Sequence, residues 1–199
     1  MISIINSGLG NVGSIKSMLE YLNIKCEIIT TKREIEHAEK LILPGVGSYD
    51  KGVNKLKEND LFDAIKLRAT VDNTPILGIC LGMQLLLDSS EEGTLSGLGL
   101  IEGRCEEFKL KNLKSPHMGW NNTIIKQENH LINRSKDVQR FYFVHSYYAA
   151  VCEENVLATT DYGIKFASAI MKNNIFGVQF HPEKSHSFGL KLFTQFNKI

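Results

Sequence analysis

Cys80 is the side chain of this sequence best placed to act as a nucleophile. It lies in Gly78-Ile79-Cys80-Leu81-Gly82, with one glycine two residues before the cysteine and another two residues after it. This spacing is typical of a nucleophile elbow, a sharp strand-to-helix turn that carries serine in many hydrolases. Glycines suit such a turn because side chains would obstruct its strained backbone. The turn would also set the thiol at the start of a helix, where the helix dipole favours the thiolate.

The alternative interpretation of Cys80 is that of most free cysteines, a small buried apolar residue. The surrounding pattern favours the nucleophile. The apolar run 76–79 predicts a strand buried on both faces. The apolar residues between positions 83 and 87 predict a helix directly after it. A cysteine at this strand-to-helix change is where an elbow would place it.

A thiol nucleophile needs a base, and His181 is the best-placed histidine. It follows an apolar strand that ends at Pro182, which cannot donate to a β-ladder. Strand ends are where α/β sheets carry their chemistry. Glu183 is two residues further on and can point to the same side, where it would orient the imidazole. A lone His-x-Glu is usually an incidental surface pair, but together with Cys80 it predicts a catalytic triad.

The sequence has six histidines, so other candidates exist for the same role. His37 and His130 lie in polar stretches and are typical of surface residues. His117 and His145 lie near apolar segments and stay open as functional candidates.

The elements that must position these residues begin with an alternation of strands and helices. Strands are predicted at 2–5, around 24–28, at 41–43 and at 76–79, and an amphipathic helix starts at Val12. This β-loop-α-β order predicts a parallel sheet with right-handed crossovers.

Beyond Gly97 the pattern changes to strands with no long helix between them until residues 186–198. We expect an α/β fold with an open mixed, mainly parallel sheet, flanked by helices, and a β-rich second half. No linker, repeat or low-complexity segment divides the chain, so residues 1–199 are expected to form one domain. The strands expected in the second half are 98–108, 123–126, 141–151, 156–160, 166–171 and 175–180.

Two glycine-rich turns follow predicted strands. Gly8-Leu9-Gly10-Asn11-Val12-Gly13 matches G-x-G-x-x-G, but no acidic residue clearly ends the second strand, so a tight turn is favoured over a nucleotide site. Gly45-Val46-Gly47 could bring free peptide amides close to a ligand, although taken alone it is an ordinary turn.

Composition narrows the class of protein further. The net charge is +1 without a basic block, so no nucleic acid or membrane partner is expected. The four cysteines are far apart and form no C-x-x-C pair, which argues against a metal site and against disulfides, and we expect no cofactor. Reduced cysteines, a start without a secretory pattern and no run of about 20 apolar residues predict a cytoplasmic protein.

These residues carry a resemblance to the class I, triad-type glutamine amidotransferases. Within that group the sequence resembles the glutaminase subunits of imidazole glycerol phosphate synthases. The resemblance runs in order along nearly the whole chain. Its motifs are Leu43-Pro-Gly-Val-Gly47, Gly78-Ile-Cys-Leu-Gly-Met-Gln84, Ser89-Ser-Glu-Glu-Gly93, Pro116-His-Met-Gly-Trp-Asn121, Tyr142-Phe-Val-His-Ser-Tyr147 and Gln179-Phe-His-Pro-Glu-Lys-Ser185.

The resemblance implies that Cys80 attacks the side-chain amide of L-glutamine and that His181 and Glu183 assist, with release of glutamate and ammonia. Backbone N–H groups of Val46 and Leu81 would form the oxyanion hole. The remaining implied contacts with glutamine come from Gly45, Gly47, Gln84, Ser146 and Tyr147, the last two through the main chain.

The resemblance also implies a partner, because nothing in the chain is left over to form a second active site. That partner would be a synthase/cyclase subunit with a (β/α)8 barrel, docked as a heterodimer over Asn11, Trp120 and Lys184. The ammonia would then serve histidine biosynthesis. Trp120 is the only tryptophan, and it could be an exposed anchor or a core residue.

Two alternatives remain open. Close paralogues supply ammonia to sugar amidotransferases in surface-polysaccharide pathways, and Asn6-Ser7 replaces the acidic-aromatic pair that many relatives carry near the partner face. The other alternative is a partner-binding subunit without turnover. The intact Cys80, His181 and Glu183 argue against it.

Overall fold

The computed structural model describes residues 1–110, 113–132 and 138–199. Its centre is a parallel sheet whose strands lie in the order β2-β1-β3-β4-β12. The predicted alternation of strands and helices is therefore confirmed for the first half of the chain. These strands are β1 (Ile2–Ile5), β2 (Cys26–Ile29), β3 (Lys40–Gly45), β4 (Ile76–Cys80) and β12 (Ile175–Val178).

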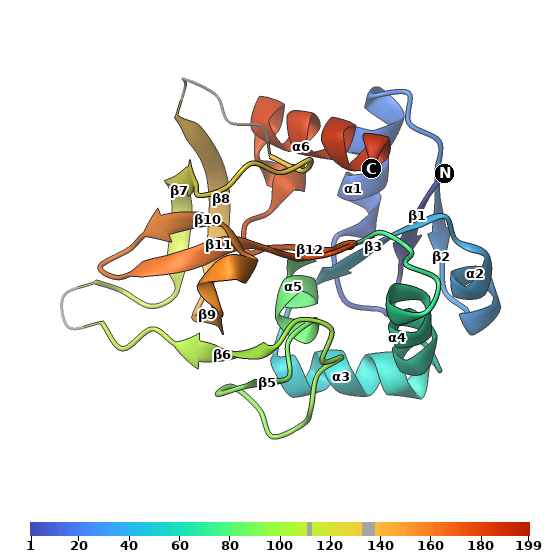
Figure 1. Ribbon diagram of the computed structural model, residues 1–199, viewed down its shortest axis with the longest axis horizontal. Coiled ribbons are helices and arrows are strands. Elements are labelled where there is room, and N and C mark those ends of the chain that lie inside the picture. Colours follow the sequence, from blue (N-terminus) through green and yellow to red (C-terminus); the bar gives the residue numbers. More distant parts are fainter. Residues whose placement is uncertain (111–112, 133–137) are drawn as a thin grey trace.

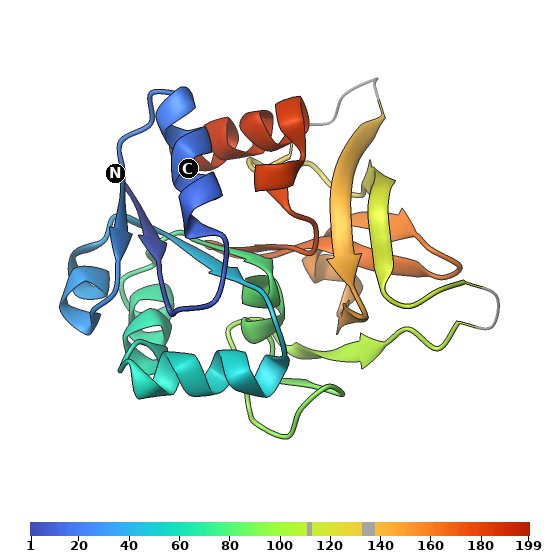
Figure 2. The same ribbon diagram turned by 180° about the vertical axis from the view of Figure 1, so that it is seen from behind.

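Helices cover both faces of this sheet (Figure 1). Helices α1 and α6 contact each other on one face, and α3 and α4 contact each other on the opposite face (Figure 2). Buried residues form a separate apolar core on each face, so alternate residues of β1 belong to different cores. The helices are α1 (Val12–Tyr21), α2 (Lys32–His37), α3 (Tyr49–Glu58), α4 (Phe62–Thr70), α5 (Leu81–Leu85) and α6 (His186–Lys198).

The second half of the chain extends the sheet in antiparallel fashion beyond β12, in the order β11-β10-β7-β8. A side branch joins β9 to β11, β6 to β9 and β5 to β6. The predicted mixed sheet with a β-rich second half is thus confirmed. The strands are β5 (Ser89–Ser90), β6 (Gly103–Glu107), β7 (His117–Ile125), β8 (Gln139–His145), β9 (Tyr147–Val151), β10 (Val156–Asp161) and β11 (Lys165–Lys172).

Several predicted boundaries were wrong. The single strand expected at 141–151 is two strands, β8 and β9, which separate at Ser146 and pair with different neighbours. The strand expected at 98–108 begins only at Gly103, whereas that expected at 123–126 begins at His117. Strand β3 continues through Pro44, because β1 pairs only as far as Ile42 and leaves no ladder bond for the proline to break.

The first glycine-rich turn has the contacts of a tight turn. Asn6 Oδ1 accepts a hydrogen bond from Gly8 N at 3.1 Å. Gly10 has φ +132°, and a β-carbon there would lie 3.1 Å from the Cβ of Pro44. Asn11 caps α1, accepting from Ser14 N at 3.2 Å. These contacts favour the turn interpretation over a nucleotide site.

In the described ranges, no helix has both the length and the apolar character needed to cross a membrane.

Candidate active site

The predicted elbow is formed where β4 ends at Cys80 and α5 begins at Leu81. Cys80 has φ +54° and ψ −111°, a conformation that non-glycine residues rarely adopt. The flanking glycines are required by close backbone contacts. A β-carbon on Gly82 would lie 1.8 Å from the carbonyl oxygen of Leu43, and one on Gly78 would lie 2.7 Å from the carbonyl oxygen of Gly82. The spacing around the cysteine therefore reflects a steric demand of the turn.

His181 and Glu183 form the predicted pair beside this elbow. His181 Nδ1 lies 2.8 Å from Glu183 Oε1, and the two side chains are 2% and 3% exposed. Because β12 pairs directly with β4, its carboxyl end delivers His181 to the same edge of the sheet as Cys80. Strand alternation is not what brings the pair together. His181 follows the end of β12, and Glu183 sits in a 3-10 turn, η2 (Pro182–Lys184).

The electrostatics of His181 reflect burial and two neighbouring side chains, Cys80 and Glu183. Burial by itself lowers the pKa of the imidazole, but the interactions with Cys80 and then with Glu183 outweigh it and raise the pKa to about 10. Among the described residues, the Nε2 atom of His181 has no hydrogen-bond partner. An imidazolium held by a carboxylate on one side and adjacent to a thiol on the other can exchange a proton with a sulfur nucleophile.

A cavity of about 300 Å³ lies over the elbow, and most of the predicted site residues line it. Its lining includes the nucleophile and the base, while Glu183 lies behind His181 and outside the lining. Gly45 also stays outside the lining, although it pairs directly with Cys80 across β3 and β4. The lining residues are Val46, Gly47, Cys80, Leu81, Gln84, Glu92, Pro116, Val144, His145, Ser146, Tyr147 and His181.

The predicted oxyanion loop lies against the start of α5. A β-carbon on Gly45 would be 2.9 Å from the Cβ of Leu81, so only glycine allows this approach. Gly47 has φ +104°, which also favours glycine. Val46 between them is exposed, and it borders the cavity together with Leu81. The two predicted amide donors thus come from segments packed against each other beside the thiol.

Gln84 is anchored on the cavity wall by its amide nitrogen. Nε2 donates to the carbonyl of Tyr147 at 3.3 Å and to Gln179 Oε1 at 3.2 Å. Both amide hydrogens are used in this way, so Gln84 can offer a ligand its acceptor atom, Oε1.

The main-chain carbonyls of Ser146 and Tyr147 have partners within the protein. Ser146 O accepts from Phe108 N at 3.1 Å, and Tyr147 O accepts from His145 Nδ1 at 2.7 Å as well as from Gln84. A carbonyl oxygen has two lone pairs, so the Tyr147 oxygen is fully used by these two bonds. The contacts of Ser146 and Tyr147 with glutamine through the main chain stay a prediction.

Sequence reasoning missed Gln179 and Glu92. Gln179 is fully buried, with Nε2 3.8 Å from Cys80 Sγ, and the readable signal was a lone polar residue in the apolar run 175–180. Glu92 brings a carboxylate to the cavity and accepts from Tyr49 N at 2.8 Å. Nothing local in the sequence linked Glu92 to Cys80, because α3 and the loop after β5 meet only in the folded chain.

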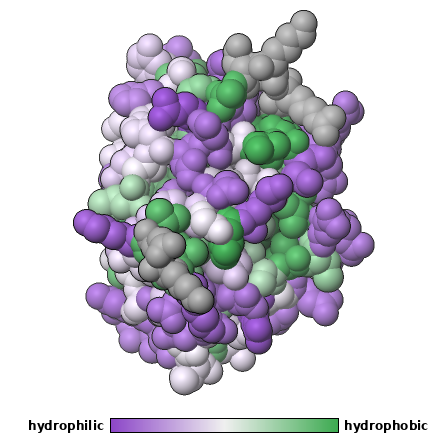
Figure 3. Space-filling model, turned by 90° about the vertical axis from the view of Figure 1, so that its left-hand side faces the viewer, coloured by the Kyte–Doolittle hydropathy of each residue, from purple (hydrophilic) through white to green (hydrophobic). Residues whose placement is uncertain are grey.

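The three predicted interface residues lie outside the cavity. Trp120 is 40% exposed and stacks on His186, with ring centroids 5.5 Å apart and an interplanar angle of 4°. Lys184 Nζ lies 5.6 Å from the ring centroid of Tyr142, which also contacts Trp120. Asn11 is exposed at the start of α1, a helix that contacts the η2 turn carrying Lys184. Figure 3 views the molecule from the side of β7 and β8 and shows hydrophobic patches among polar ones there.

This fold and this site define the class of the protein. The family model described as "Glutamine amidotransferase class-I" matches residues 3–198, and the chain belongs to this family of enzymes. The resemblance drawn from the motifs is thereby confirmed.

Full-length relatives narrow the class to a particular subunit. The chain is 52% identical to "Imidazole glycerol phosphate synthase subunit HisH 2" of Methanococcus maripaludis over 100% of this chain and 99% of the relative. It is 41% identical to the protein of the same name from Pseudomonas aeruginosa, over 100% of both chains. It is 42% identical to "Imidazole glycerol phosphate synthase subunit HisH" of Leptospira interrogans, again over 100% of both.

Solved structures share the fold at low sequence identity. A crystal structure titled "glutamine amidotransferase" superposes with a TM-score of 0.76 at 18% identity and covers 100% of this chain and 99% of its own. "Structure of PurLQS from Thermotoga maritima" gives a TM-score of 0.76 at 17% identity, covering 99% and 97%.

Proposed function

We propose that this chain is the glutaminase subunit of an imidazole glycerol phosphate synthase. It would hydrolyse L-glutamine and pass the ammonia to a synthase/cyclase subunit in histidine biosynthesis. The observation that carries the proposal is that Cys80 and His181 line one cavity, with Glu183 bonded to His181 behind it, in a chain 52% identical over its full length to a protein of that name.

The first half-reaction breaks the amide bond of glutamine. The Cys80 thiolate attacks the side-chain carbonyl carbon, and the oxyanion that forms is stabilised by the N–H groups of Val46 and Leu81. Each such donor contributes about 3–4 kcal/mol in comparable sites. His181 gives its proton to the departing nitrogen, so that ammonia leaves and a γ-glutamyl thioester remains.

The second half-reaction restores the enzyme. Neutral His181 accepts a proton from water, whose oxygen attacks the thioester, and glutamate and the Cys80 thiolate are released. Glu183 holds the imidazole through Nδ1 and stabilises its charged form in both steps. No metal or cofactor enters this scheme.

Substrate recognition rests on groups that suit an amino acid. The carboxylate of Glu92 is complementary to the α-ammonium group of glutamine, and Gln84 Oε1 can accept an N–H from the substrate. Gly45 and Gly47 keep the oxyanion loop close to Cys80, while Ser146 and Tyr147 form the opposite wall.

We assign residues 1–199 to one glutaminase domain that acts in the cytoplasm as half of a heterodimer. The partner is a (β/α)8-barrel synthase/cyclase that contacts Asn11, Trp120 and Lys184. An ammonia-producing cavity at the edge of the sheet needs a cover that directs the product to its acceptor. The exposed Trp120 next to Lys184 and Tyr142 suits such a contact.

The test is glutamate release from glutamine by the chain alone, and then with a barrel cyclase and its ribulosyl-nucleotide substrate. Strong stimulation by the cyclase, abolished in Cys80→Ala, is expected. Release that responds instead to a sugar amidotransferase would move the enzyme to polysaccharide synthesis. Glutamate release that is unchanged in Cys80→Ala would overturn the catalytic assignment.

A further inference from the structure

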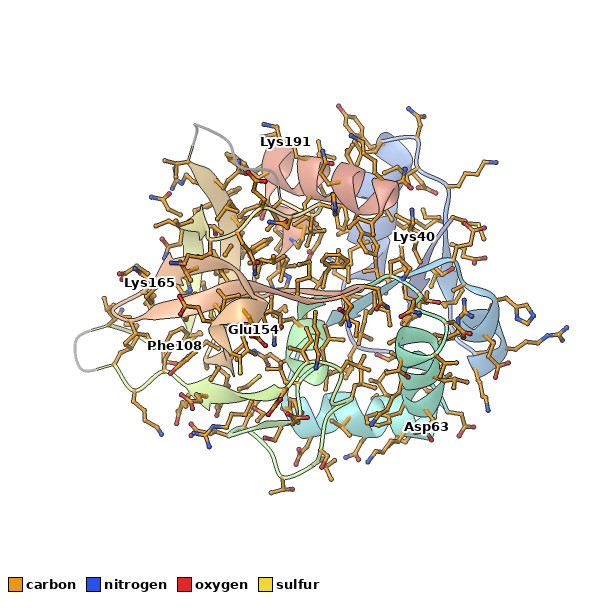
Figure 4. The ribbon with its side chains drawn as sticks, viewed as in Figure 1. Lys40, Asp63, Phe108, Glu154, Lys165 and Lys191 are labelled. Carbon is orange, nitrogen blue, oxygen red and sulfur yellow. The ribbon has the colours of Figure 1, made fainter. Side chains whose placement is uncertain are left out.

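His117 and His145, which the catalytic scheme does not use, form a buried pair beside the cavity. They lie directly opposite each other on β7 and β8 and are 3% and 6% exposed. His117 Nδ1 is 2.9 Å from His145 Nε2. Aromatic rings surround the pair, including Phe108, labelled in Figure 4, whose centroid is 5.2 Å from that of His145. A polar pair in such surroundings costs stability unless every polar atom has a partner.

Both imidazoles are held neutral. Burial lowers the pKa of His145 to about 3 and that of His117 to about 4. Each ring at neutral pH therefore carries one hydrogen, and the hydrogen bonds decide which nitrogen has it.

The hydrogen bonds then run in a single direction. The Tyr147 carbonyl can only accept, so His145 Nδ1 carries the hydrogen in the 2.7 Å bond between them. His145 Nε2 must accept, so His117 donates from Nδ1, and His117 Nε2 accepts from Asn121 Nδ2 at 3.1 Å. Asn121 uses the same amide nitrogen to donate to the carbonyl of Asp161 at 2.9 Å. Every nitrogen of the two rings is therefore satisfied, in one arrangement.

This chain of bonds ends at the substrate pocket. The Tyr147 carbonyl that receives His145 also receives Gln84, and Gln84 continues to Gln179, whose amide nitrogen lies 3.8 Å from Cys80 Sγ. The orientation of the Gln84 amide thus depends on where the Tyr147 carbonyl is held.

We propose that His117 and His145 are positioning residues of the glutamine site. Through the Tyr147 carbonyl they fix the Gln84 amide so that its Oε1 faces the bound substrate. The inference rests on the proposed glutaminase function and adds to it two residues that act through the Tyr147 carbonyl: His145, which also lines the cavity, and His117, which lies behind it.

The test compares His117→Phe with His117→Asn in the complex with the cyclase. Phenylalanine keeps the ring that stacks on Phe143 and Tyr162 at 4.8 and 4.1 Å, but it cannot donate to His145. Asparagine loses the stacking and retains a donor nitrogen near the Nδ1 position. We expect His117→Phe to raise the KM for glutamine about tenfold with kcat changed less than about threefold, since one hydrogen bond is lost away from the reacting atoms. His117→Asn should restore most of the KM.

Phe166→Leu is the matched control for packing. Phe166 contacts both histidine rings, with centroids 5.7 and 5.1 Å away, and makes no side-chain hydrogen bond. The substitution Phe166→Leu should lower the melting temperature and leave the KM for glutamine unchanged. The proposal is overturned if His117→Phe only lowers the melting temperature, as Phe166→Leu does. A failure of the proposed glutaminase function would give a different result, because the unsubstituted chain would then also release no glutamate.

A spectroscopic measurement on the unsubstituted protein removes dependence on variants that fold poorly. The ¹⁵N spectra of the two side chains should show neutral rings with the hydrogen on Nδ1 from pH 8 to pH 5. A hydrogen on Nε2 of His145 would leave the Tyr147 carbonyl without the donor from His145, and that result would refute the proposal.

Discussion

Cys80 combines the reactive group of the site with a strained backbone. Its φ of +54° and ψ of −111° place its backbone in a conformation that costs about 1–3 kcal/mol for a non-glycine residue. The surrounding strand and helix impose this conformation, since β4 is fully buried and all five residues of α5 are buried. The packing of β4 and α5 thus offsets the strain and holds the thiol at the cavity.

This strain leads to a prediction for two inactive variants. Cys80→Ala and Cys80→Gly should both abolish glutamate release, but the glycine variant should unfold with a free energy higher by about 1 kcal/mol, because glycine adopts positive φ without strain. Urea denaturation measures the difference. Equal stability of the two variants would show that the elbow is relaxed.

His181 gives a prediction for the pH dependence of stability. Its pKa is raised to about 10 in the folded protein, against about 6.5 in an unfolded chain. The folded state therefore binds the proton more tightly. The stabilising contribution is complete below pH 6.5 and is lost as the pH rises toward 10. The stability advantage of the unsubstituted chain over His181→Gln should shrink across this interval.

The variant Cys80→Ala tests which neighbour raises the pKa of His181. Cys80 is the larger of the two raising interactions, so the pKa of His181, followed by the ring-proton shift in NMR spectra, should be lower in Cys80→Ala. An unchanged pKa of His181 in that variant would contradict the assignment of Cys80 as the larger cause of the shift.

Residue types and spacing were enough to predict the three triad members as a group. Spacing around Val46 indicated only a turn with close backbone approach, and its role as an oxyanion loop came from the family resemblance and stays a prediction. The register of β7 with β8 could not be predicted from the sequence, because it pairs residues that are 28 positions apart. His117 and His145 therefore stayed open candidates until the fold brought them together.

At the scale of elements, the elbow between β4 and α5 requires a residue without a side chain at position 82. A β-carbon there would lie 1.8 Å from the backbone oxygen of Leu43, which belongs to the central strand β3 and has no room to move. We expect Gly82→Ala to destabilise the protein by more than about 3 kcal/mol, at the upper end for single substitutions.

Gly13→Ala is the matched control for this prediction. Gly13 lies in α1, and a β-carbon there would meet nothing within 4 Å. Alanine should stabilise the helix by about 0.5–1 kcal/mol. Both values follow from urea denaturation, and a Gly82→Ala protein as stable as the unsubstituted chain would refute the steric argument.

The elements that periodicity predicted best were the strands buried on both faces. Their limits were harder to predict, because pairing partners decide where a strand stops. The break at Ser146 is an example, since β8 pairs with β7 while β9 turns to β6 and β11. Helix α2 was missed although Thr31 and Glu34 form a capping box that could have been read from the sequence.

At the scale of the whole molecule, both halves of the chain line the cavity, and the exposed Trp120 lies on the β-rich half. We expect Trp120→Ala to weaken binding to the cyclase at least tenfold, because exposed aromatic anchors dominate interface energies. Alkylation of Cys80 in the free chain should be unaffected. Calorimetric titration of the two subunits provides the measurement.

Leu67→Ala is the control for this interface. Leu67 is 50% exposed on α4, on the side of the molecule away from β7 and β8 (Figure 1). Its loss should leave the affinity unchanged. Equal weakening by both substitutions would place the partner elsewhere.

Strand β7 faces outward and inward at alternate positions. Met118, Trp120 and Ile124 are exposed, whereas His117 and Thr123 are buried. If the partner docks at Trp120 as proposed, the residues of β7 that contact it and those that pack in the interior occupy different positions of one strand. Under that proposal, a duplicated gene could acquire a different ammonia acceptor through substitutions at the exposed positions of β7, with the buried positions unchanged.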